Sequence, residues 1–128
     1  DGFKAQGDLR HAPSHIIDVA PTCLSAAGLS GKGMAGKSLL PVFAKDSNKG
    51  RTPYWEHEGN RAMREGKWKL VAKGATGPWE LYDIKADRTE LNNLAEKQPK
   101  RLKRMAARWE SWAVASLAKP WPWGKKKK

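Results

Sequence analysis

The alternation of side chains between residues 67 and 73 constrains the fold more than any other feature of this sequence. Trp68, Leu70 and Ala72 are apolar, and the residues beside and between them are mostly lysine. A period of two is typical of a strand that buries one face and exposes the other. Gly66, just before this segment, can adopt the positive φ that a tight turn requires. We therefore predict an antiparallel hairpin that pairs this segment with the residues before the glycine.

A turn-rich stretch at residues 74–78 leads into residues 79–83, where the side chains alternate again. Three to four short antiparallel strands are expected in total. A sheet of this kind has one apolar face and needs a partner to cover it. The predicted partner is a long amphipathic helix beginning at Pro99. Its apolar residues recur at spacings of three and four: Leu102, Met105, Ala106, Trp109, Trp112 and Ala113.

The chain is strongly basic, with 25 Lys and Arg against 13 Asp and Glu and a net charge of +12. Such a charge attracts nucleic acid, an acidic membrane surface, or a sulfated or phosphorylated substrate. No apolar run approaches the ~20 residues that span a bilayer, so we expect no membrane partner. The single cysteine, Cys23, excludes an internal disulfide, and no metal site is predicted.

A short helix is predicted near the start of the chain. Asp18 is placed to cap it, Pro21 falls in its first turn, and Gly28 ends it. Its apolar face consists of the small or medium side chains Ala20, Cys23, Leu24 and Ala27. Small side chains suit close packing against a larger body. Because the sequence also begins without Met, we expect a fragment of a longer chain.

Three phrases in this order resemble the C-terminal end of the sulfatases, in particular bacterial arylsulfatase-type enzymes of the alkaline-phosphatase-like superfamily. They are HIIDVAPTCLSAAG at residues 15–28, WKLV at residues 68–71 and ELYDIKADRTELNNLA at residues 80–95. The resemblance implies an α+β fold, in which a C-terminal amphipathic helix packs on a small antiparallel sheet of three to four strands. A short helix belonging to the large α/β domain would precede this sheet.

The resemblance also divides the chain. Residues 1–46 would be the end of the large sulfatase domain, residues 47–118 the C-terminal subdomain, and residues 119–128 a disordered basic tail. The partner would be the missing N-terminal catalytic domain, and the location periplasmic or secreted.

The implied activity is hydrolysis of sulfate esters by a formylglycine made from Cys or Ser, beside a calcium ion held by Asp and Asn. The modified residue lies in a C-x-P-S-R or C-x-A-x-R context. Cys23 lies in CLSAAG, which departs from both patterns. We therefore predict no catalytic residue and no metal ligand in this chain, and no activity for it alone.

The C-terminal subdomain of sulfatases borders the substrate pocket, and residues 57–61 match such a rim best. We predict His57, Asn60 and Arg61 as substrate-binding residues for a sulfated small molecule or glycan, with Gly59 turning the backbone between them. The alternative for His57 is a surface histidine that pairs with the adjacent glutamates. Trp55 and Trp79 are candidates for a sugar-binding wall.

Two other functions remain open. The basic face of the helix at residues 99–117 and the lysine tail could form a polyanion or nucleic-acid binding module, although a charged outer face is the usual state of a surface helix. A relative in the same superfamily that cleaves phosphate esters or phosphonates is the other alternative, because the nucleophile context decides between these reactions. An upstream C-x-P-S-R motif would favour the sulfatase, and tight salt-sensitive DNA binding would favour the module.

Overall fold

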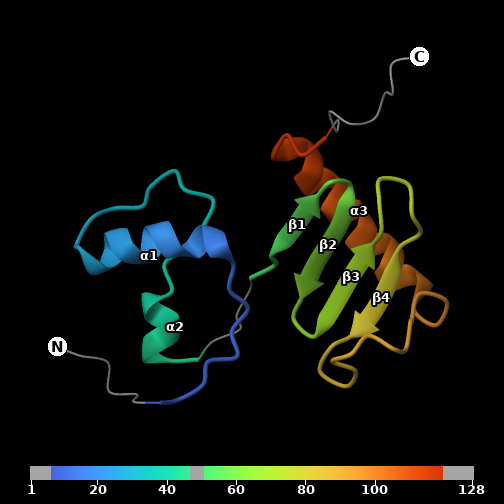
Figure 1. Ribbon diagram of the computed structural model, residues 1–128, viewed down its shortest axis with the longest axis horizontal. Helices are drawn as coiled ribbons and strands as arrows, with labels where there is room; N and C mark the ends of the chain where they lie inside the picture. The colour runs from blue at the N-terminus through green and yellow to red at the C-terminus, as the bar shows by residue number, and fades with distance from the viewer. Residues whose placement is uncertain (1–6, 47–50, 120–128) are drawn as a thin grey trace. The chain divides into compact units, whose positions relative to one another are not determined.

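A computed structural model describes residues 7–46 and 51–119 of the chain. The chain divides into two compact units, Asp1–Arg51 and Thr52–Lys128, which we call unit 1 and unit 2 (Figure 1). The predicted disordered tail lies outside the described residues, apart from Lys119. The assignment of residues 1–46 to a large domain stays a prediction.

Unit 2 contains a four-stranded antiparallel sheet in the order β1-β2-β3-β4 (Figure 1). Glu65 pairs with Trp68 across a turn in which Gly66 has a φ of 58°, so the hairpin predicted from the sequence is confirmed. The strands are β1 (Tyr54–His57), β2 (Asn60–Glu65), β3 (Trp68–Ala72) and β4 (Glu80–Asp83).

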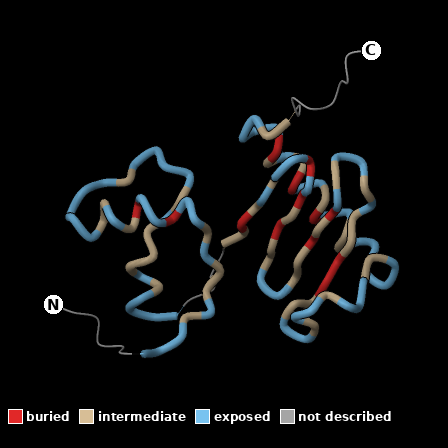
Figure 2. Tube along the Cα trace, in the orientation of Figure 1, coloured by how far each residue is buried: buried red, intermediate tan, exposed pale blue. Residues whose placement is uncertain are grey.

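The long helix α3 (Pro99–Ala115) packs against one face of this sheet. The indole of Trp109 is fully buried, and its Nε1 donates a hydrogen bond to the carbonyl of Trp55 at 3.1 Å. Figure 2 shows the buried residues along the strands and along the helix. The core of buried residues is Met63, Leu70, Leu81, Met105, Trp109 and Ala113. The predicted α+β fold and the predicted apolar face of the helix are therefore confirmed.

Unit 1 contains the 3-10 helix η1 (Ile16–Asp18) and the helices α1 (Val19–Ala26) and α2 (Leu40–Ala44). Asp18 stands at the predicted N-cap of α1, but its carboxylate does not cap that helix. It accepts hydrogen bonds from the backbone N–H groups of His15 and Lys37, at 2.8 and 2.9 Å, and pairs with Arg51. Burial tends to raise the pKa of Asp18, but these partners outweigh it and hold the pKa below its usual value.

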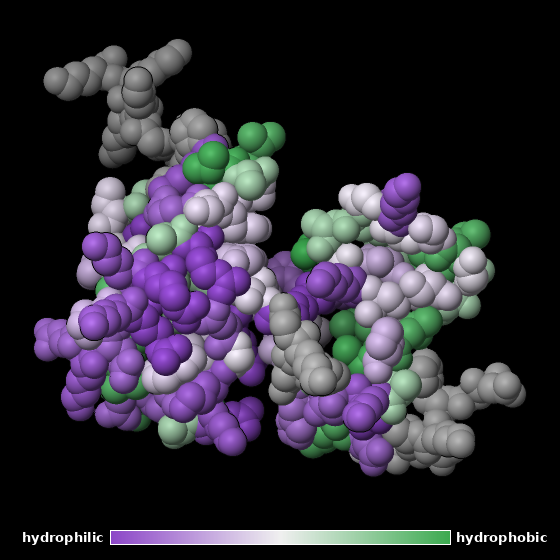
Figure 3. Space-filling view, turned by 180° about the vertical axis from the view of Figure 1, so that it is seen from behind, coloured by the Kyte–Doolittle hydropathy of each residue, from purple (hydrophilic) through white to green (hydrophobic). Residues whose placement is uncertain are grey.

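The described part of unit 1 buries only Asp18 and Pro21. Cys23 is exposed, so the face of α1 that was predicted to pack on a larger body is open to solvent here. Figure 3 shows hydrophobic residues at the surface of this unit. The exposed large apolar residues are Leu9, Ile16, Ile17, Val19, Leu29, Met34 and Phe43. In residues 7–46 and 51, unit 1 therefore has an apolar surface and no cluster of buried apolar side chains. Within residues 7–46 and 51–119, no helix is long and apolar enough to cross a membrane.

Candidate functional site

The tip of the hairpin between β1 and β2 carries the residues predicted to bind substrate. The last residue of β1, His57, pairs directly with the first of β2, Asn60. Between them, Glu58 and Gly59 both have positive φ, 51° and 85°, the geometry of a tight hairpin turn. The backbone N–H of Gly59 donates to Oε1 of Glu56 at 2.7 Å, which fixes the turn from below.

The strand pleat separates the three predicted residues into two groups. Side chains alternate along a strand, and paired residues on neighbouring strands share a face. Met63 belongs to the core under α3, so Arg61, two residues before it, points to the same face. His57 and Asn60 lie on the opposite face, where both are exposed. The structure thus brings His57 and Asn60 together and directs Arg61 away from them.

The guanidinium of Arg61 is 6% exposed and binds within unit 2. It lies over the ring of Trp79, 4.3 Å from the centroid, and donates to the carbonyls of Gly74 at 3.2 Å and Gly77 at 2.6 Å. Oε1 of Glu110 on α3 lies 3.9 Å from Nη1 of Arg61. Burial lowers the pKa of Arg61 below its usual value, and Glu110 opposes this shift. Arg61 therefore fastens the loop between β3 and β4 to the inner face of the sheet.

The same loop is held to the hairpin tip from the other side. Oδ1 of Asn60 accepts a hydrogen bond from the backbone N–H of Gly74 at 2.9 Å. A Cβ on Gly59 would lie 3.0 Å from the backbone nitrogen of Ala75, so only glycine allows this close approach without a shift. The amide group of Asn60 still has its NH₂ to donate elsewhere.

His57 extends from the end of an edge strand into solvent. None of the ion pairs formed by the described residues involves it, so the alternative of a histidine paired with adjacent glutamates finds no support there. Trp55 shares its face of β1 and is 36% exposed. An imidazole, an amide and an indole thus stand near one another at the strand end.

Trp79 does not belong to this surface. It packs edge-on against Trp109, with ring centroids 5.5 Å apart and an interplanar angle of 62°, and its face is covered by Arg61. Of the two tryptophans predicted for a sugar-binding wall, Trp55 is exposed and Trp79 is covered by Arg61. The role of Glu110 beside Arg61 was not predicted, because the two residues are distant in sequence and the pattern of α3 shows only which residues face the core.

No group of three or more His, Cys, Asp and Glu that could hold a metal ion occurs within the described ranges. The exposed side chains of the hairpin tip are the imidazole of His57, the carboxylate of Glu58 and the amide of Asn60. The imidazole and the amide can donate hydrogen bonds to the oxygen acceptors of a ligand.

Residues 4–111 match the family described as N-sulphoglucosamine sulphohydrolase, C-terminal. The chain is 31% identical over 101 residues to arylsulfatase K of Danio rerio, a match that covers 68% of this chain and 19% of the relative. It is 35% identical over 98 residues to choline-sulfatase of Rhizobium meliloti, covering 69% of this chain and 19% of the relative. The chain thus spans about a fifth of the length of these curated relatives.

The solved structure of a 2-O GAG sulfatase is similar to this chain with a TM-score of 0.60 and 29% identity. The match covers 78% of this chain and 24% of that one. Sequence and fold comparisons agree over most of the described residues. The chain therefore belongs to the sulfatases, a family of sulfuric ester hydrolases, and corresponds to their C-terminal part.

Proposed function

We propose that this chain forms the C-terminal part of an enzyme that hydrolyses sulfate esters, and that the β1–β2 hairpin tip forms part of its substrate-pocket rim. Membership of the sulfatase family supports the reaction class. The observation that supports the rim assignment is that His57 and Asn60 are exposed side by side at a turn. Hydrogen bonds from Gly59 to Glu56 and from Gly74 to Asn60 hold this turn in place.

Sulfate-ester cleavage needs hydrogen-bond donors near the sulfuryl group, because negative charge builds on its oxygens as the ester oxygen leaves. The imidazole N–H of His57 and the NH₂ of Asn60 are donors of this kind. Arg61 serves the same rim indirectly, because it fixes the loop that Asn60 also binds. We therefore assign Arg61 a positioning role.

The family uses calcium and a formylglycine nucleophile. The described residues do not fit either group, since no cluster of metal ligands occurs among them and Cys23 lacks the required context. We propose instead that the nucleophile and the calcium ligands lie in an N-terminal catalytic domain.

The exposed apolar residues of unit 1 support an N-terminal catalytic domain as the partner, because burying each of these side chains fully would stabilise the assembled protein by roughly 1.5–3 kcal/mol. The substrate class we propose is a sulfated sugar or a glycan built from such sugars. The family description names N-sulphoglucosamine, and one similar structure is a GAG sulfatase. A periplasmic or secreted location is consistent with bacterial relatives of this family.

Replacement of His57 tests the rim. In the intact protein that carries this chain, His57→Ala is expected to lower kcat/KM for a sulfated monosaccharide by about 100–1,000-fold, because one donor to the reacting group is removed. The midpoint of thermal unfolding should stay unchanged, because the side chain is exposed. Steady-state kinetics and calorimetry measure the two effects.

The matched control is His11→Ala, which removes an exposed histidine of unit 1. It should leave both quantities unchanged. If His57→Ala retains full activity, His57 does not contact the substrate and the hairpin tip is not part of the rim. If the unaltered protein hydrolyses no sulfate ester, the reaction class itself is wrong.

A further inference from the structure

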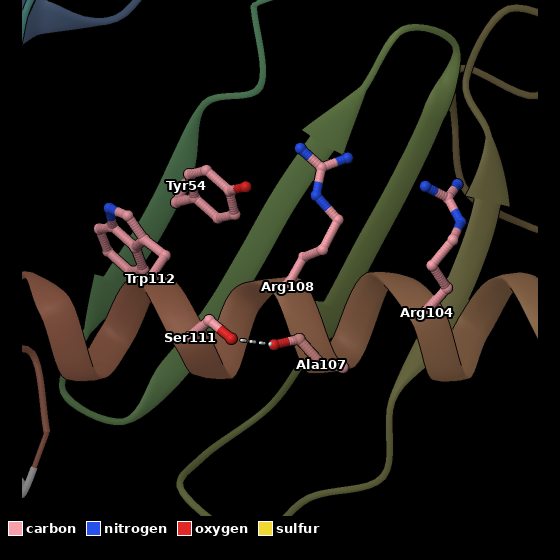
Figure 4. A pocket seen from close by; sticks show the side chains of 6 residues that line it. All are labelled: Tyr54, Arg104, Ala107, Arg108, Ser111 and Trp112. Carbon is pink, nitrogen blue, oxygen red and sulfur yellow. Dashed lines mark hydrogen bonds between the residues drawn. The ribbon is translucent and has the colours of Figure 1, made fainter.

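Unit 2 has a second surface feature, an open groove between α3 and the edge strand β1, with a volume of about 620 Å³. Figure 4 shows the side chains that line it, with the two arginines side by side on α3 and pointing toward the strands. The lining residues are Tyr54, Arg104, Ala107, Arg108, Ser111 and Trp112. Tyr54 faces α3, so the groove opens on the opposite side of the sheet from His57.

One end of the groove is aromatic. The rings of Tyr54 and Trp112 stack with centroids 5.1 Å apart and an interplanar angle of 9°. The two stacked rings together form an apolar wall. Both residues are only half-buried, and a flat apolar ligand face can pack on the part that remains exposed.

The other end is cationic. Arg104 and Arg108 both bind the carboxylate of Glu65, and their side chains are still 50% and 41% exposed. The hydrogen bond from Arg104 holds the pKa of Glu65 below its usual value against burial, and Arg108 and Arg101 add to the effect. Two guanidinium groups thus bind one carboxylate, which leaves a surplus of positive charge beside the aromatic wall.

Glu65 also pre-organises this end. Its carboxylate holds the planar guanidinium groups of Arg104 and Arg108 in place from one side. Each guanidinium has five N–H donors. The donors that Glu65 does not use can bind a sulfate or carboxylate group in the groove at a small entropic cost. Ser111 adds a hydroxyl oxygen that can accept, because its own proton is donated to the carbonyl of Ala107 at 3.0 Å.

We propose that this groove binds an acidic sugar unit of a sulfated glycan, away from the reacting ester. The apolar face of the sugar would pack on the Tyr54–Trp112 wall, and its sulfate or carboxylate would bind Arg104 and Arg108. The identity of the ligand rests on the proposed function, while the groove and its charge do not. The site would raise affinity for long substrates without taking part in the reaction.

The test compares two substrates of the intact protein, a sulfated monosaccharide and a sulfated hexasaccharide. The double variant Arg104→Gln/Arg108→Gln is expected to raise KM for the hexasaccharide about tenfold, with kcat unchanged and with both constants unchanged for the monosaccharide. Ser111→Trp should give the same pattern, because it fills the groove without a change of charge. The control Lys85→Gln/Arg88→Gln removes two exposed charges outside the groove and should have no effect.

Equal KM values for the hexasaccharide in the groove variants and the unaltered protein would overturn the proposal. If the groove variants lost affinity for single-stranded DNA but kept their affinity for the hexasaccharide, the ligand of the groove would be a nucleic acid and not a glycan. Failure of the proposed function has a different signature, because neither substrate would then be hydrolysed. In that case, direct titration of the hexasaccharide and of its unsulfated counterpart, at two salt concentrations, measures whether the groove binds the sulfated glycan.

Discussion

Trp109→Ala is expected to lower the free energy of unfolding of unit 2 by about 3–5 kcal/mol. Its indole is 0% exposed, contacts Trp79 and Trp112, and ties α3 to the backbone of β1 through the carbonyl of Trp55. The alanine would leave a cavity at the centre of the core and remove the hydrogen bond from the indole to the carbonyl of Trp55. Since domains have total stabilities of roughly 5–15 kcal/mol, this loss would be a large fraction of the stability of unit 2.

Denaturant unfolding of the 128-residue chain, followed by far-ultraviolet circular dichroism, measures this loss. The control is Val114→Ala, which truncates a 63% exposed side chain of the same helix and should change the free energy by less than about 0.5 kcal/mol. Similar stabilities for the two variants would show that α3 does not pack on the sheet as described.

Arg61→Ala is expected to destabilise unit 2 by about 3 kcal/mol, because the loop between β3 and β4 loses its main attachment to the sheet. Two carbonyl groups, of Gly74 and Gly77, would lose their donor, and the face of Trp79 would lose its cationic partner. The same unfolding experiment applies. Arg64→Ala is the matched control, since that side chain lies on the opposite face and binds only the turn at Gly66.

The two roles considered for Arg61 predict opposite results. A positioning residue loses stability and activity together when replaced. A residue that contacts the substrate loses activity alone, so an Arg61→Ala variant with unchanged stability and no hydrolysis would restore the role predicted from the sequence.

The architecture of unit 2 could be predicted from the sequence because apolar residues recur with a clear period in both its strands and its long helix. The alternation around Leu70 and the helical spacing around Trp109 depend on neighbouring residues and are directly visible. The sulfatase resemblance, which rests on three phrases in a fixed order, is confirmed by the family match.

The contacts of Asp18 and Arg61 could not be predicted from the same patterns. Asp18 stands at a helix start, which suggested a cap, but its main partners, Lys37 and Arg51, lie 19 and 33 residues away in sequence. The separation of Arg61 from Asn60 follows from the sequence once residues 57–61 are divided between two strands. A period of two then puts Arg61 on the face of Met63 and Asn60 on the opposite face.

We propose that the hairpin tip of unit 2 closes the substrate pocket of a sulfatase. A crystal structure of the intact protein with a sulfated sugar bound tests this proposal most directly. We predict that the side chain of His57 or Asn60 donates a hydrogen bond to the sugar or its sulfate, at about 2.7–3.2 Å. A bound sugar with no atom of residues 57–60 within hydrogen-bonding distance would contradict the claim.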